Sequence, residues 1–143
     1  MALNGPIILV EDDTNDVDVI IEAIKEIGVT NEVIAFYTAQ EAYDFLITTT
    51  ESPFFILCDV RMPYVDGLSF RRNIFKNEEL RKKSIPFIFF TGLVSQDIVN
   101  EAYNLEVQGF FEKAPSYDAI KEQLLTLCLY WKQCLHPNIK FPV

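Results

Sequence analysis

The sequence predicts an α/β fold in which a five-stranded parallel sheet is covered by helices on both faces. Short apolar runs of strand length alternate with longer stretches of helical period along the chain. The run at 54–58 is apolar throughout, which is typical of a central strand buried on both sides. Strict alternation of five predicted strands with five predicted helices favours parallel strands joined by right-handed crossovers.

The N-terminal part supplies two strands and two helices. The first strand, at 6–10, is rich in β-branched residues. The helix at 14–27 places its apolar residues on one face and is followed by Gly28, which suits a helix C-cap. A second strand is predicted at 32–37. Thr38 opens the second helix, because Thr-Ala-Gln-Glu is a capping-box sequence.

The rest of the chain repeats this pattern. The strand at 54–58 leads through a loop with Pro63 and Gly67 into a third helix, which we expect to run to about Leu80. The remaining predicted elements are strands at 86–90 and 108–112, a helix capped by Ser95, and a last helix capped by Ser116 and stopped by His136-Pro137.

Length and composition fit one domain. The chain has 143 residues, half of them apolar, which is enough for one full core and too short for two comfortable ones. No linker, repeat or low-complexity segment divides it. We therefore expect a single domain over 1–143, with its core at about 6–135 and a C-terminal tail at 136–143.

Charge and cysteine content exclude several functions. A formal net charge of −9 argues against direct binding to nucleic acid or to an anionic membrane, since both need a basic surface. No apolar stretch is long enough to span a bilayer, and the N-terminal apolar run is too short for a signal peptide. The three cysteines form no Cys-x-x-Cys pair, so we expect a reduced, cytoplasmic protein.

Polar residues follow the predicted strands at the edge where such sheets bind ligands. Carboxylates at about 4 Å repel by on the order of 4 kcal/mol per pair, so a cluster of them tends to capture a cation. Oxygen ligands favour Mg²⁺, and a hydroxyl and a lysine suit phosphate oxygens. For Asp13, a role as the N-cap of the following helix explains its position better than a role in a cation site. The strand-end residues are Glu11-Asp12-Asp13, Asp59, Thr91 and Lys113.

These segments make residues 6–135 resemble the receiver domain of response regulators. The four matching motifs are Ile8-Leu-Val-Glu-Asp-Asp13, Cys58-Asp-Val-Arg-Met-Pro63 with Asp66-Gly67-Leu68, Phe90-Thr91-Gly92, and Gly109-Phe-Phe-Glu-Lys113. The resemblance implies a flavodoxin-like fold with strand order 2-1-3-4-5. It also implies a bacterial two-component signalling role, in which the domain catalyses only its own phosphorylation and dephosphorylation and is otherwise not an enzyme.

The resemblance also assigns roles within the site. Asp59 would accept a phosphoryl group from a sensor histidine kinase or a phosphotransfer protein. Thr91 and Lys113 would bind oxygens of the transferred group. The implied ligands of Mg²⁺ are Asp12 and Asp59 directly, the main-chain carbonyl of Arg61, and Glu11 through a water molecule.

Switching and partners follow from the same resemblance. Phosphorylation would draw Thr91 inward, and Phe110 would turn into the vacated space. The surface that changes comprises the helix capped by Ser95, the strand at 108–112 and the last helix. We expect it to bind an unknown downstream protein or a second copy of the chain, since no output domain follows. Candidate exposed apolar residues on this surface are Tyr103, Leu129 and Tyr130.

Two features depart from the family pattern. Receiver domains usually carry Lys-Pro with a cis bond, whereas this chain has Lys113-Ala114-Pro115. A cis bond before alanine costs about 2.5–4 kcal/mol, so we expect a trans Lys113–Ala114 bond or a turn shifted by one residue. The resemblance implies that the positions of Arg61 and Leu93, which vary in the family, tune how fast water reaches the phosphate. Because both are bulky, they predict slow self-dephosphorylation.

Two alternatives remain open at this point. The first is a pseudo-receiver, a protein-interaction module of the same fold that is not phosphorylated; only the Lys-Ala-Pro turn favours it. The second is an enzyme on a similar sheet, either an aspartate-nucleophile phosphatase or a flavin protein. Such a phosphatase would need an acid two residues after Asp59, where this chain has Arg61.

Overall fold

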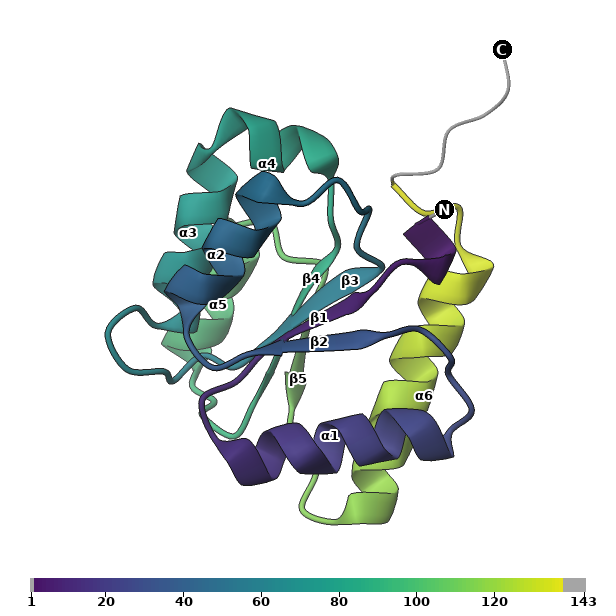
Figure 1. The fold of residues 1–143 in the computed structure, drawn as a ribbon. Coiled ribbons are helices and arrows are strands. Elements are labelled where there is room, and N and C mark those ends of the chain that lie inside the picture. The colour runs from purple at the N-terminus through teal and green to yellow at the C-terminus, as the bar shows by residue number, and fades with distance from the viewer. Residues whose placement is uncertain (1, 138–143) are drawn as a thin grey trace.

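The computed structural model describes residues 2–137, and its centre is one parallel sheet (Figure 1). The strand order is β2-β1-β3-β4-β5, and every neighbouring pair is parallel. The predicted fold class and strand order are therefore confirmed. The strands are β1 (Ile7–Val10), β2 (Val33–Phe36), β3 (Phe55–Cys58), β4 (Phe87–Thr91) and β5 (Gly109–Glu112).

Helices cover both faces of the sheet. Figure 1 shows α1 and α6 together on one face and α2, α3, α4 and α5 on the opposite face. The helices are η1 (Ala2–Asn4, a 3-10 helix), α1 (Thr14–Glu26), α2 (Ala39–Thr48), α3 (Gly67–Lys76), α4 (Glu78–Lys83), α5 (Gln96–Asn104) and α6 (Tyr117–Gln133). Each intervening helix returns the chain to the same end of the sheet. The carboxyl ends of all five strands therefore share one edge.

Two apolar clusters, one on each face, form the core. Strands β1, β3 and β4 are buried along their whole length, as their continuous apolar sequences predict. Alternate residues point to opposite faces, so Phe89 packs under α2, α3 and α5, whereas Phe90 packs under α1 and α6. In β5, Phe110 and Phe111 separate in the same way, which confirms the predicted opposite orientation of this pair.

The predicted third helix is wrong in one respect. Instead of one helix running to about Leu80, the chain forms α3 and then a separate α4, so the described residues contain six α-helices and not five. The break is at Asn77, whose backbone is extended. Its side chain accepts from Leu80 N at 3.1 Å and donates to the Tyr43 hydroxyl at 2.8 Å. An asparagine favours this conformation because its side chain replaces helical hydrogen bonds at a cap.

The predicted helix caps are confirmed. Thr38, Ser95 and Ser116 each accept a hydrogen bond from a main-chain N–H of the following first turn. Asp13 caps α1 in the same way, by accepting from Asn15 N and Asp16 N. Gly28 follows α1 with a φ of +85°, which glycine adopts without strain.

The chain turns back onto the domain after α6. His136 is buried, and its Nε2 lies 2.6 Å from the carbonyl oxygen of Phe54. The predicted end of the last helix near His136 is confirmed to within three residues, because α6 ends at Gln133. The rest of the predicted tail, 138–143, lies outside the described residues.

Candidate functional site

Main-chain pairing brings the predicted site residues together. Asp59 N donates to the carbonyl oxygen of Val10 at 3.0 Å, and Lys113 N donates to that of Thr91 at 2.9 Å. These bonds continue the sheet one residue past the strand ends, so the side chains that follow lie around one open pocket. Its lining comprises Glu11, Asp12, Asp13, Asp16, Asp59, Arg61, Thr91, Gly92, Leu93 and Lys113.

Three carboxyl groups form the acidic part of the pocket. One carboxylate oxygen from each of Glu11, Asp12 and Asp59 lies within 4.8 Å of the other two. Glu11 is only 2% exposed, whereas Asp12 is exposed. Burial, a hydrogen bond to Asp59 and the negative charge of Asp59 raise the pKa of Glu11 to about 9. A carboxyl group kept protonated in this way would lose its proton to solvent when a cation binds. The three oxygen donors fit a hard divalent ion such as Mg²⁺.

Asp59 is held by hydrogen bonds from its own loop and from β4. Its Oδ1 accepts from Val60 N at 2.7 Å and from the Thr91 hydroxyl. A longer bond of 3.3 Å comes from Arg61 N. Burial acts to raise the pKa of Asp59, but the hydrogen bonds from Glu11 and Thr91 and the charge of Lys113 outweigh it and lower the pKa. Asp59 is therefore ionised and oriented at neutral pH.

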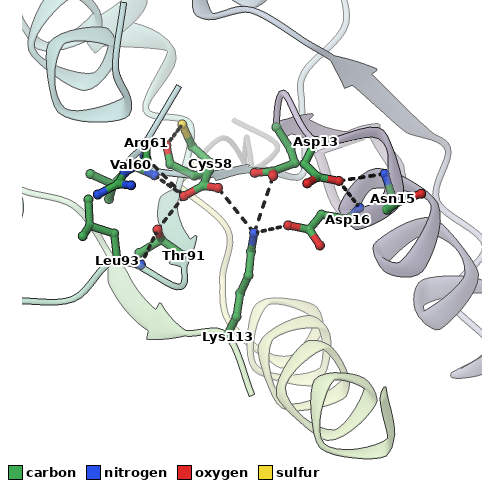
Figure 2. A network of polar contacts seen from close by, with 11 residues as sticks. Asp13, Asn15, Asp16, Cys58, Val60, Arg61, Thr91, Leu93 and Lys113 are labelled. Carbon is green, nitrogen blue, oxygen red and sulfur yellow. Dashed lines mark hydrogen bonds and ion pairs between the residues drawn. The ribbon is translucent and has the colours of Figure 1, made fainter. Parts of the chain in front are cut away.

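Lys113 supplies the positive charge that contacts the acidic groups of the pocket (Figure 2). Its Nζ lies 3.4 Å from Asp59 Oδ2 and 3.6 Å from Glu11 Oε1. Burial acts to lower the pKa of Lys113, yet the hydrogen bond to Asp16 and the neighbouring carboxylates raise it overall. The ammonium group is charged and lies where it neutralises part of the acidic cluster.

Asp16 is the member of this pocket that the sequence analysis missed. It lies in the first turn of α1, and its Oδ2 is 3.0 Å from Lys113 Nζ, the shortest of the three ion pairs of this lysine (Figure 2). The prediction that site residues follow the ends of strands does not include Asp16, because Asp16 belongs to a helix. The available signal is its spacing: Asp16 lies three residues after the cap Asp13, so both face the same end of α1.

Gly67 lets the loop after β3 close under Asp59. Its N donates to the carbonyl oxygen of Val60 at 2.8 Å. A Cβ built on Gly67 would lie 2.1 Å from the carbonyl oxygen of Asp59 and 2.9 Å from the Phe89 ring. No larger residue fits without moving the segment that carries Asp59.

The remaining predicted residues surround this centre. Arg61 and Leu93 line the pocket, and Leu93 N donates to Thr91 Oγ1 at 3.1 Å. Phe110 is half-buried, with its ring centroid 5.6 Å from that of Phe89. Within residues 2–137 every peptide bond is trans, so Lys113–Ala114 is trans as expected. The predicted exposure of Tyr103, Leu129 and Tyr130 is confirmed, with values of 50%, 49% and 60%.

Comparisons with known proteins agree with this arrangement. Residues 7–125 match the family model of the response regulator receiver domain. A probable methanogenesis regulatory protein, FilR2 of Methanothrix harundinacea, is 29% identical over 129 residues, covering 87% of this chain and 82% of that protein. The chain belongs to the response regulator receiver family. Proteins of this family are signalling domains of two-component systems.

Solved structures show the same fold. The phosphorylated cyanobacterial phytochrome response regulator RcpA is 24% identical, with a TM-score of 0.81 over 90% of this chain and 94% of that one. The Mn²⁺-bound response regulator Rcp1 is also 24% identical, with a TM-score of 0.79 over 96% of this chain and 99% of that one. No helix among residues 2–137 is long and apolar enough to cross a membrane.

Proposed function

We propose that this chain accepts a phosphoryl group on Asp59 and thereby changes its affinity for a partner protein. One observation carries the proposal. The Asp59 carboxylate lies in an open pocket, where carboxylate oxygens of Glu11 and Asp12 are within 4.8 Å and the Lys113 ammonium group is 3.4 Å away. Such a pocket provides a nucleophile, a place for a divalent cation and a positive charge for phosphoryl oxygens.

The transfer needs little covalent chemistry from the protein. A carboxylate oxygen of Asp59 attacks phosphorus, the bond from phosphorus to the donor's imidazole nitrogen breaks, and the imidazole leaves with its bonding electrons. Thr91 and Lys113 would bind the phosphoryl oxygens, and their contacts with Asp59 support this role. The main contribution of the protein is therefore positioning and charge stabilisation.

Glu11, Asp12 and Asp59 are the side chains that would hold Mg²⁺, with the main-chain carbonyl of Arg61 as the further predicted ligand. Bound there, the ion would supply positive charge to the phosphoryl oxygens. Glu11 fits this role because it is buried with other acids around it and gains a counter-charge when a cation binds. That Rcp1 has been solved with Mn²⁺ supports the choice of a divalent cation.

The switch would begin at Thr91. Its hydroxyl already donates to Asp59, so the predicted inward movement takes the form of an exchange of acceptor, from the carboxylate to the phosphoryl group. Leu93 N, which donates to the same hydroxyl oxygen, would follow it. Phe110 would respond by repacking against Phe89. The surface of α5, β5 and α6 would then bind the downstream partner.

The donor would be a sensor histidine kinase or a phosphotransfer protein, in the cytoplasm. A second copy of the chain, bound through α5, β5 and α6, is the alternative to a different downstream protein. The exposed side chains of Tyr103, Leu129 and Tyr130 support an interface on this surface.

Acetyl phosphate provides the direct test. Incubation of the protein with acetyl phosphate and Mg²⁺ should add one phosphoryl group, detected by intact-protein mass. Asp59→Asn should remain unmodified, and removal of Mg²⁺ with a chelator should abolish the reaction. A wild-type protein that never gains the mass would favour the pseudo-receiver, which binds partners through the same fold without phosphorylation.

A further inference from the structure

The turn that carries Lys113 is held by one side chain from α6. Gln123 Oε1 accepts from Ala114 N at 3.1 Å, and Gln123 Nε2 donates to the carbonyl oxygen of Glu112 at 2.7 Å. These two main-chain groups belong to the residues immediately before and after Lys113. The amide side chain thus uses its acceptor and its donor on either side of a single residue.

The position of this turn explains why a brace is needed. β5 is at the edge of the sheet, so main-chain groups on its outer side have no strand to pair with. The inner side is fixed by Lys113 N, which donates to Thr91 O at 2.9 Å. On the outer side, Gln123 takes the place of a neighbouring strand by pairing with the main-chain groups of Glu112 and Ala114. The main chain on both sides of Lys113 is therefore tied to β4 and to α6.

Ala114 makes this arrangement possible because its main-chain N–H donates to Gln123. A proline after the lysine would have no N–H to donate and would restrict the turn by its ring. Alanine leaves the turn freer and adds a half-buried N–H that needs an acceptor. Gln123 accepts a hydrogen bond from that N–H and thereby restricts the turn, as a proline ring would. Ala114 supplies the donor, and Gln123 supplies the acceptor.

We propose that Gln123 is a positioning residue for Lys113, one that fixes the reach of the ammonium group toward Asp59 by bracing the main chain on both sides of the lysine. The inference rests on the proposed function, because the placement matters for phosphoryl transfer. A long side chain amplifies a small rotation of its backbone at the terminal nitrogen. Displacement of a reacting group by about 1 Å can slow catalysis by on the order of a hundredfold.

The test compares three substitutions on α6. Gln123→Met keeps the length and helix propensity and removes both hydrogen bonds. Gln123→Glu keeps an acceptor for Ala114 N–H and loses the donor to Glu112. Gln133→Met is the matched control, since Gln133 is an exposed residue at the end of the same helix. Each protein is phosphorylated with acetyl phosphate at saturating Mg²⁺, and the dissociation constant of Mg²⁺ is measured separately.

Gln123→Met should lower the rate of phosphorylation about tenfold and leave the dissociation constant of Mg²⁺ unchanged, because the carboxylates are untouched. Gln123→Glu should be intermediate, and Gln133→Met should match wild type. In a Lys113→Met background, Gln123→Met should have no further effect. A Gln123→Met rate equal to wild type would overturn the inference. An undiminished effect in the Lys113→Met background would do the same, because it would indicate a general structural role.

A second readout separates this inference from the proposed function. A crystal structure of Gln123→Met, compared with that of the wild type, gives the distance between Lys113 Nζ and Asp59 Oδ2 directly. This distance should differ from the 3.4 Å of the wild type, because the main chain on both sides of Lys113 is no longer held by α6. If acetyl phosphate fails to modify the wild type, the proposed function fails, and the two structures still decide the role of Gln123. An unchanged position of Lys113 Nζ would refute that role.

Discussion

The Lys113 ammonium lies 3.0 Å from the carboxylate of Asp16 and 3.4 Å from that of Asp59. The two acids come from different parts of the fold, Asp16 from the start of α1 and Asp59 from the end of β3. The lysine is therefore shared before any phosphoryl group arrives. Under the proposed function, an incoming phosphoryl group would have to draw the ammonium group away from Asp16, and this contact would oppose binding of the phosphoryl group.

Asp16→Asn should strengthen the response to a phosphoryl analogue. The substitution removes the carboxylate charge that competes with Asp59 for the Lys113 ammonium group. Because Asp16 is nearly half exposed, solvent screens the pair, and we expect a gain of about two- to fivefold in affinity for beryllofluoride with Mg²⁺. Titration followed by NMR measures it. Asp18→Asn, the same charge change at an exposed position of α1, is the control. Equal affinities in wild type and Asp16→Asn would contradict the prediction.

Glu11→Gln should stabilise the metal-free protein more at pH 8 than at pH 5. Folding raises the pKa of Glu11 from 4.5 to about 9, so its stabilising contribution is full below about pH 4.5 and is lost as the pH rises toward 9. Glutamine imitates the protonated form at every pH. We expect a gain on the order of 2 kcal/mol at pH 8 in the free energy of unfolding, measured with urea and a chelator.

The control for this pH effect is Glu22→Gln, which changes an exposed acid on α1. It should alter stability similarly at both pH values. A Glu11→Gln gain that is constant between pH 5 and pH 8 would show that Glu11 keeps an ordinary pKa in the folded protein.

Removal of Mg²⁺ should lower the thermal stability of the wild type. A cation that binds only the folded state stabilises it by about 2.7 kcal/mol at a hundred times its dissociation constant. Asp12→Asn should raise the melting temperature without metal, because one charge of the acidic cluster is gone, and should abolish most of the Mg²⁺ effect. Scanning calorimetry with Mg²⁺ and with a chelator measures both. Asp18→Asn should retain the full metal response.

Gly67→Ala should destabilise the fold. Its Cβ would lie 2.1 Å from the carbonyl oxygen of Asp59, which is main chain and has to move with the whole loop. We expect a loss of about 2–4 kcal/mol in the free energy of unfolding, measured with urea. Gly92→Ala is the control, because a Cβ at Gly92 meets nothing within 4 Å. A Gly67→Ala protein as stable as Gly92→Ala would mean that the loop adapts freely.

Most of the fold could be predicted because strands and helices alternate and differ in hydrophobic period. The site could be predicted where its residues follow strands, since parallel strands end at one edge. The break at Asn77 was missed, because its hydrogen bond to Tyr43 comes from a distant part of the chain. Asp16 and Gln123 were missed for a related reason. Each acts on Lys113 from a helix, and the packing of α1 and α6 brings them there.

Arg61 and Leu93 should make the phosphorylated form long-lived. Both side chains line the pocket around Asp59, and Leu93 offers no side-chain group to orient a water molecule. Exchange of both for serine should accelerate loss of the phosphoryl group on the order of tenfold. Water then gains access to the phosphoryl group, and a serine hydroxyl can orient the attacking water molecule. Decay is followed by intact-protein mass after removal of acetyl phosphate. Tyr64→Ser, at a 97% exposed position of the loop that carries Arg61, should leave the decay unchanged. Equal or slower decay in the double variant would show that these two side chains do not limit hydrolysis.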